Sequence, residues 1–414
     1  MMPVTVTIGG IPNTSYHIFY NIKKGIPMLT HGYTYLAVLI AITALIVFTE
    51  KKTRHRLFDY LPSIVILYFT MMMLSTLGVW QKTPEITALY KSVKSNLLPA
   101  MIFLMLLTAD MREIFKLGKK MILTFLLASV SIAIGFVGMF ALFHHHFSPD
   151  AWKPFAALSG SWMGGTGNMV AIQGALNLPD ADMGYALLID SVDYAIWVMI
   201  LLALVPFAAR FNKWSKADTH IIDEVGERLA QKEAARSSTT GGSILLLLVA
   251  AATVSAGSQY IAHFLPTTDF LSTTTWVVIL STLIGILGAM TPLAKLGGAS
   301  GLGTAMLYLL VALIASRANF GELTEAPLYV AAGFVIIMIH VIIMVLFAKL
   351  FKLDLFSLGV ASLANIGGVA SAPILASAYS KALIPIGVLM AMMGYILGTF
   401  GGLAVGKVLE MIAH

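Results

Sequence analysis

Long apolar segments alternate with short polar stretches along the whole chain. Runs of roughly 17–25 apolar residues are long enough to cross a bilayer as helices. In the first half they lie near 33–49, 58–80, 97–115, 120–143, 152–177 and 183–207. In the second half they lie near 243–265, 275–291, 299–317, 327–350, 355–378 and 382–411. The pattern of six runs, a polar stretch and six more runs predicts two similar halves.

The composition fits this pattern. Hydrophobic residues make up 58% of the chain and charged residues 11%, whereas soluble domains carry about 25% charge. The predicted fold class is an all-α polytopic membrane protein with about 10–12 transmembrane helices. Cysteine is absent, which excludes disulfides and thiolate metal sites. The net charge of +6 lies mostly in short loops, where it reports orientation and not nucleic-acid binding.

Four regions follow from the apolar pattern. They are a non-membrane N-terminal arm (1–32), a first transmembrane repeat (33–207), a polar linker (208–241) and a second transmembrane repeat (242–414). The linker contains apolar residues at helical spacing with charges between them, which predicts an amphipathic surface helix. Those apolar residues are Ile221, Ile222, Val225 and Leu229.

Two glycine-rich segments, 159–172 and 361–373, are the most informative motifs. Their glycine pairs, Gly164-Gly165 and Gly367-Gly368, lie almost half a chain apart, in the fifth apolar run of each half. Glycine lets the backbone turn without a side-chain clash. In a bilayer such a break is tolerated only where it is buried in protein or lines a cavity. The matched pair predicts discontinuous helices that cross near the midplane and form a transporter binding site.

A helix that restarts after such a break presents unpaired N–H groups and partial positive charge, which attract anions. Nearby amides and hydroxyls bind ligands or the freed backbone groups. The alternative is close helix packing through small residues. The predicted substrate- or ion-binding residues are Gly164, Gly165, Thr166, Asn168, Gln173, Asp190, Asp193, Asn365, Gly367, Gly368 and Ser371.

Asp190 and Asp193 lie in the sixth run, three residues apart, on adjacent positions of one helix. A carboxylate inside a bilayer is costly and therefore indicates function. It binds Na⁺ or takes up H⁺, and we predict Asp190, Asn168 and Asn365 as ligands of a coupling Na⁺. The alternative is that one or both aspartates sit near the cytoplasmic end of the helix, in contact with water. No other cofactor is expected, and no nucleophile elbow, Walker loop or HExxH motif indicates an enzyme.

Basic loops give a conflicting topology. The loop 50–56 and the stretch 109–120 are rich in Lys and Arg and are predicted to be cytoplasmic. In the second half, Lys295, Lys349, Lys352 and Lys407 are taken to mark cytoplasmic ends, which favours an inverted repeat. Six crossings per half would instead make the halves parallel. We prefer inverted halves of five core crossings with extra peripheral segments.

Two further features have simpler interpretations. His340 lies in the middle of an apolar run and is predicted to be a packed, hydrogen-bonded residue, with a proton relay as the alternative. The glycines of the last run recur at near four-residue spacing, which favours close helix packing. They are Gly394, Gly398, Gly401 and Gly402.

The motifs Gly164-Gly165-Thr166-Gly167-Asn168, Ala364-Asn365-Ile366-Gly367-Gly368 and Gly394-Tyr395 followed by Gly398 resemble the YjcL-like family of bacterial integral membrane proteins of unknown function. Ser191, Leu363 and Thr399 stand where that pattern often has Asn. The family is grouped with the cation/proton antiporters and the bile acid, citrate and glutamate transporters. The resemblance implies inverted repeats, a domain with broken crossing helices and a panel domain that often dimerises.

The resulting expectation is an ion-coupled (Na⁺ or H⁺) secondary transporter of a small organic anion, amino acid or small peptide that works by alternating access. A Na⁺/H⁺ antiporter is the alternative, and a passive channel or membrane scaffold is the second alternative. The expected location is the bacterial cytoplasmic (inner) membrane. The expected partners are a small-molecule substrate, the lipid bilayer and a second copy of the chain in a homodimer.

Overall fold

The computed structural model describes residues 28–53, 63–109, 114–217, 239–268, 271–320, 325–380 and 383–414. These residues are almost entirely helical, and six of the helices are long and apolar enough to cross a membrane. The protein is therefore a polytopic, all-helical membrane protein. Most of the predicted N-terminal arm and the predicted amphipathic helix of the linker lie outside the described residues.

Helices fill the predicted apolar runs of both halves. In the first half they are α2 (Gly32–Thr53), α4 (Ser63–Leu77), α5 (Pro84–Leu107), α7 (Gly118–Phe143), α8 (Trp152–Gly164), α9 (Thr166–Ala175), α10 (Met183–Leu204) and the short α11 (Ala208–Ser215). In the second half they are α13 (Gly241–Ala262), α14 (Thr273–Ala289), α15 (Ala299–Ala315), α16 (Ala326–Phe351), α17 (Leu355–Ile366), α18 (Gly368–Tyr379) and α19 (Ile384–Ala413).

Local capping signals set several of these boundaries. The Thr83 hydroxyl accepts the Ile86 N–H, and Pro84 occupies the first turn of α5, where its missing N–H costs nothing. The prediction of a helix over the apolar run 97–115 is therefore wrong about where this helix begins, which is at Pro84. Its first turns carry polar residues that the hydropathy pattern assigned to a loop.

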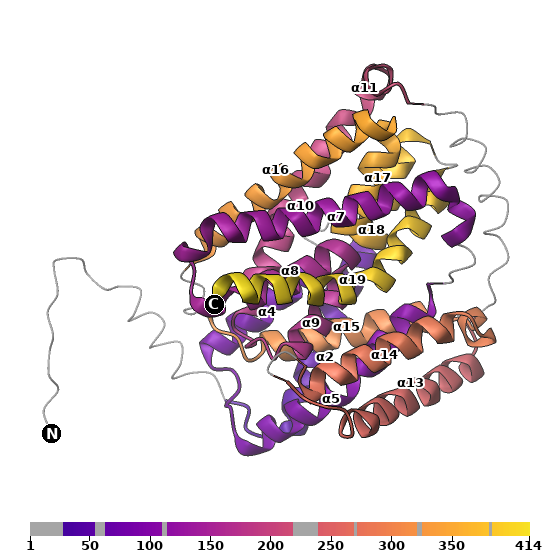
Figure 1. Cartoon of the computed structure of the whole chain (residues 1–414). Coiled ribbons are helices and arrows are strands. Elements are labelled where there is room, and N and C mark those ends of the chain that lie inside the picture. The colour runs from indigo at the N-terminus through magenta and orange to yellow at the C-terminus, as the bar shows by residue number, and fades with distance from the viewer. Residues whose placement is uncertain are drawn as a thin grey trace, which may run out of the picture.

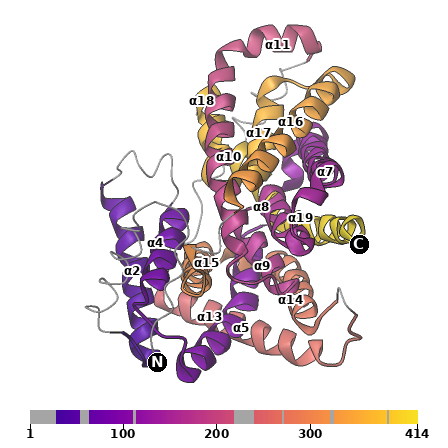
Figure 2. The same ribbon diagram turned by 90° about the vertical axis from the view of Figure 1, so that its left-hand side faces the viewer.

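The helices form two layers, which Figures 1 and 2 show from two sides. One layer, here called the panel, consists of α2, α4, α5, α13, α14 and α15, which pack on one another. The other, here called the hairpin bundle, consists of α7–α10 and α16–α19. The layers meet where α9 of the bundle packs against α5, α14 and α15 of the panel.

The fifth apolar run of the first half folds back on itself. Gly165 adopts a positive φ of 88° between α8 and α9, a conformation that favours glycine. Gly160 of α8 then faces Ile172 of α9, since a Cβ on Gly160 would collide with the Ile172 Cδ1. The two helices are therefore the arms of a hairpin with its tip at Gly165.

The fifth run of the second half is a hairpin of the same kind. Gly368 has a φ of +60° at the turn between α17 and α18. At the far ends of the two arms the rings of Phe356 and Tyr379 lie 5.2 Å apart, at 75° to each other. Both glycine pairs thus break a helix as predicted, and each break reverses the chain direction.

Helix α19 runs along both hairpins. A Cβ on Gly394 would lie 2.9 Å from the Gly164 Cα, and one on Gly402 would lie 2.8 Å from the Gly160 Cα. The close packing predicted for these glycines is confirmed. At the tips, the Gly165 Cα lies 4.0 Å from the position of a Cβ on Gly368, so the two hairpins meet tip to tip.

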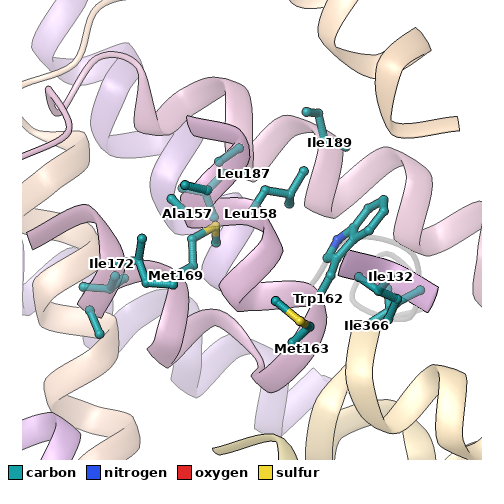
Figure 3. Close-up of a cluster of buried hydrophobic side chains, with 14 of the residues drawn as sticks. Ile132, Ala157, Leu158, Trp162, Met163, Met169, Ile172, Leu187, Ile189 and Ile366 are labelled. Atoms are coloured by element: carbon teal, nitrogen blue, oxygen red, sulfur yellow. The ribbon is translucent and has the colours of Figure 1, made fainter. Parts of the chain in front are cut away.

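The arms of the first hairpin are embedded in apolar side chains. Trp162, Met163 and Ile172 belong to one buried cluster with Ile132 of α7 and Leu187 of α10 (Figure 3). Burial of a large apolar side chain contributes roughly 1.5–3 kcal/mol in water, and dense packing takes over that role in lipid. The tip is therefore held on a rigid support.

Candidate functional site

A cavity of about 260 Å³ lies where the two hairpin tips face the panel. Its bundle side is formed by Gly165–Gly167 of the first hairpin, Ile366–Val369 of the second, Asp190 and Tyr194 of α10, and Tyr395 of α19. Its panel side is formed by Glu50, Ser63, Ile64, Val65, Met105, Thr304, Leu307 and Tyr308. We call it the inner cavity, because Glu50 and Ser63 flank the basic loop that the charge pattern places in the cytoplasm.

Helices α9 and α18 both begin at this cavity. The first N–H groups of a helix lack partners within the helix and carry partial positive charge. Among the described residues that line the cavity, the carboxylates are Glu50 and Asp190, and none is Lys or Arg. An anion in this cavity would therefore be bound by backbone N–H groups and hydroxyls, and a cation by carboxylates.

Asp190 is held in place at the cavity wall. The Trp162 Nε1 donates to its Oδ1 at 3.0 Å, and the Ser161 hydroxyl lies 3.3 Å from both carboxylate oxygens. All three residues lie at the junction of α8 and α10. Two donors on one side fix the carboxylate and leave its other lone pairs for a ligand.

The two asparagines brace the hairpins in this conformation. The Asn168 Nδ2 donates to the Gly164 carbonyl at 2.7 Å, and its Oδ1 accepts the Thr399 hydroxyl at 2.6 Å. The Asn365 Oδ1 accepts the Ser129 hydroxyl at 2.7 Å, and its Nδ2 donates to the Ala361 carbonyl at 2.9 Å. Neither lines the inner cavity, so direct Na⁺ ligation by these amides stays a prediction.

The remaining predicted site residues are spread over three places. Gly165, Thr166, Gly367 and Gly368 line the inner cavity with Asp190. Gly164, Ser371 and Asp193 are buried beside it. Gln173 lies at the far end of α9, where its Nε2 donates to Asp180 at 2.9 Å.

Asp193 is fully buried, one helical turn from Asp190. Neither of its carboxylate oxygens has a hydrogen-bond partner in the described part of the chain. It packs against Gly333 of α16, where a Cβ would collide with the Asp193 Oδ2. Burying a carboxylate without partners is costly, which sets Asp193 apart from Asp190, whose oxygens have two donors.

His340 is paired on both sides of its ring. Its Nδ1 lies 2.7 Å from the Ser131 hydroxyl, and its Nε2 lies 2.8 Å from the Ser362 hydroxyl. The Ser362 hydroxyl also accepts the Trp197 Nε1 at 2.9 Å. This network joins α7, α10, α16 and α17 and agrees with the packed interpretation of His340.

Replacing Ser362 with Ala leaves the Trp197 and His340 nitrogens buried without this partner. Unpaired buried groups cost about 1–3 kcal/mol each, so we expect a clearly lower Tm in detergent. Ser377→Ala is the matched control, since this exposed serine on the second hairpin bonds only to the Ile374 carbonyl among described residues. Equal Tm values for the two variants would contradict the structural role of the network.

Several lining residues were missed by the sequence reasoning. Tyr194 directly follows Asp193, and Tyr395 lies within the motif that carried the family resemblance, so both had a local signal. Glu50, Ser63 and Tyr308 had none, because the Ser63 hydroxyl meets Glu50 at 2.8 Å and Tyr308 at 2.6 Å only through the fold.

An all-helical membrane protein with paired hairpins whose tips meet at a cavity is the class that this fold and site define. The chain matches the family described as "Protein of unknown function (DUF819)" over residues 37–412, and it belongs to that family. It is also similar to the "Uncharacterized membrane protein YjcL" of Bacillus subtilis (strain 168). The two are 25% identical over 348 residues, which cover 81% of this chain and 87% of the relative.

Proposed function

We propose that this protein is a secondary transporter that moves a small organic anion, an amino acid or a small peptide by alternating access, coupled to Na⁺ or H⁺. The observation that carries the proposal is the inner cavity. Two symmetrically placed helix starts and one fixed carboxylate converge there, between two separate helical layers. Discontinuous helices that bring such ends together are typical of transporter binding sites.

The fold-back of both hairpins supports an inverted repeat. If each hairpin returns to the side from which it entered, each half crosses the membrane five times, and an odd number reverses the orientation of the second half. The crossings would be α2, α4, α5, α7 and α10, then α13, α14, α15, α16 and α19. This topology accounts for the basic ends at Lys295, Lys349 and Lys352, although it puts Lys407 on the opposite face.

The groups that line the inner cavity support an anionic substrate and a coupling cation. The N–H groups at the starts of α9 and α18 suit a carboxylate of the substrate, and Asp190 suits the coupling cation or a substrate ammonium group. A location in the bacterial cytoplasmic membrane and a homodimer are parts of the same proposal.

Uptake by proteoliposomes tests the proposal. We expect that radiolabelled organic acids and amino acids, screened in pools, accumulate inside under an imposed Na⁺ or H⁺ gradient, and that unlabelled substrate drives counterflow. Empty liposomes are the control for leakage. Accumulation of no pool under either gradient would contradict a symporter of these substrates.

A Na⁺/H⁺ antiporter is the second candidate, and the buried, unpaired carboxylate of Asp193 beside Asp190 favours it. Two neighbouring acids that exchange H⁺ for Na⁺ need no organic ligand. In the same liposomes, a Na⁺ gradient that moves protons without any organic solute would support the antiporter and overturn symport.

A further inference from the structure

A second, larger cavity lies between the panel and the hairpin bundle, with a volume of about 490 Å³. We call it the outer cavity. The panel contributes Tyr90, Lys91, Lys94, Ser95, Leu98 and Thr274, and the bundle contributes Gln173, Gly174, Asn177, Leu178, Pro179 and Asp180. The transport function proposed above does not involve the outer cavity.

The two cavities lie at opposite ends of α9. The first turn of this ten-residue helix, Gly165–Gly167, lines the inner cavity, and Gln173 and Gly174 in its last turn line the outer one. At 1.5 Å per residue these ends are roughly 12 Å apart. Between them α9 packs against α5, where the buried Met101 and Ile102 lie beside Asn168. This mainly apolar contact separates the two cavities.

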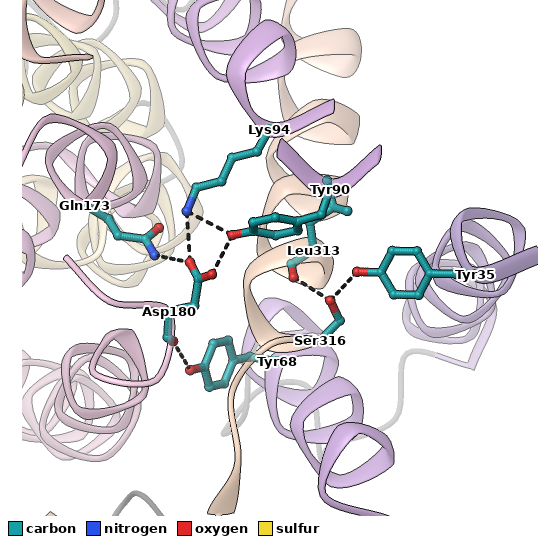
Figure 4. A network of polar contacts seen from close by, with 8 residues as sticks. All are labelled: Tyr35, Tyr68, Tyr90, Lys94, Gln173, Asp180, Leu313 and Ser316. Atoms are coloured by element: carbon teal, nitrogen blue, oxygen red, sulfur yellow. Dashed lines mark hydrogen bonds and ion pairs between the residues drawn. The ribbon is translucent and has the colours of Figure 1, made fainter. Parts of the chain in front are cut away.

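Asp180 ties the two layers together at the outer cavity (Figure 4). The Lys94 Nζ lies 2.8 Å from its Oδ1, and the Tyr90 hydroxyl donates to its Oδ2 at 2.6 Å. The Gln173 Nε2 donates to the Oδ1 at 2.9 Å, and the Tyr68 hydroxyl reaches the Asp180 carbonyl at 3.3 Å. A loop of the bundle is thus fastened to α4 and α5 of the panel.

The polar contacts at the inner cavity have a different arrangement. The Ser63 hydroxyl bonds to Glu50 and to Tyr308, and all three residues belong to the panel. These bonds do not cross between the layers. In the described part of the chain, a charged contact fastens the layers at the outer cavity, whereas these polar contacts at the inner cavity stay within the panel.

We propose that the ion pair between Asp180 and Lys94 is the outer gate of the transporter, which must break before the bundle can present the hairpin tips to the outer side. The proposal rests on the alternating-access function proposed above. The pair is suited to repeated breaking, since its side chains keep 19% and 22% of their surface exposed and water can replace the lost bonds.

Cysteine labelling tests the gate directly, because the chain has no native cysteine. Thr166→Cys places one thiol at the hairpin tip in the inner cavity. In this background we expect a membrane-impermeant maleimide to react faster from the inner face in inverted vesicles than from the outer face of intact cells. Adding Asp180→Asn should raise the rate from the outer face about tenfold, the shift produced by losing charge-assisted bonds.

Lys91→Gln is the matched control, because Lys91 lies on the same cavity wall one helical turn from Lys94, and it should leave the labelling unchanged. A charge swap tests the pair itself. Lys94→Glu should also raise labelling from the outer face, and adding Asp180→Lys should restore the low rate. The buried Gln173 Oε1, which lacks a partner among the described residues, would then accept from the new lysine.

Two outcomes overturn the proposal. Unchanged labelling in both Asp180→Asn and Lys94→Glu means that the pair does not hold the outer side closed. In the second outcome, labelling rises in both single variants and stays high in the double variant with exchanged charges. That result means that the packing of the loop closes the outer side, and that the ion pair does not. Because labelling needs no substrate, failure of the transport assay leaves this test readable.

Discussion

Asp190→Asn is expected to reduce gradient-driven uptake about a hundredfold and to remove its dependence on Na⁺ or pH. The substitution keeps the shape of the side chain, and an amide oxygen can still accept the Trp162 Nε1, now 3.0 Å from the carboxylate. The substitution removes the negative charge of Asp190 and leaves that of Glu50 across the cavity. A bond to a charged group is worth up to roughly 3 kcal/mol, which corresponds to a factor of about one hundred.

The matched control is Asp150→Asn at the opposite end of α8. That carboxylate pairs with Lys153 at 2.9 Å and keeps 71% of its side-chain surface exposed, so its loss should change neither uptake nor Tm. Uptake by both variants is measured in proteoliposomes against Na⁺ concentration and pH. If Asp190→Asn keeps the Na⁺ or pH dependence of the parent, coupling must be assigned elsewhere, with Asp193 as the next residue to replace.

The sequence predicted where the apolar helices lie but not how the fifth run of each half is folded. A run of this length has the same hydropathy whether it crosses the membrane as one helix or folds back as a hairpin. The glycine pairs indicate a break, yet the angle depends on contacts such as Gly160 against Ile172 and Phe356 against Tyr379. If both runs fold back within the membrane, as proposed above, the crossing count no longer suggests parallel halves and agrees with the inverted halves suggested by the loop charges.

The site was predictable to a similar degree. Asp190 and the hairpin tips had strong local signals, because a carboxylate and paired glycines are unusual in apolar helices. The partners of Asn168 and Asn365 lie on α19 and α7, more than half the chain away in sequence. The contribution of the panel to the cavity was equally hidden, since Glu50 and Ser63 lie near helix ends and fit a solvated loop just as well, while Tyr308 lies inside an apolar helix.

Gly402→Ala is expected to destabilise the protein by about 2–3 kcal/mol, whereas Gly401→Ala should be nearly neutral. Both glycines lie in α19, where alanine gains up to about 1 kcal/mol in helix propensity. A Cβ on Gly402 would lie 2.8 Å from the Gly160 Cα and 2.9 Å from its N. Backbone cannot give way as a side chain does, so overpacking costs more than the propensity gain.

At Gly401 the new Cβ would meet only the Met163 Cε and Sδ, both at 3.2 Å. These atoms end a flexible side chain that can move aside, so the propensity gain offsets the crowding. The comparison is made by thermal unfolding in detergent, together with uptake in liposomes, since Gly402 spaces α19 from the first hairpin. A Gly402→Ala variant as stable as Gly401→Ala would mean that α19 does not approach the backbone of the first hairpin this closely.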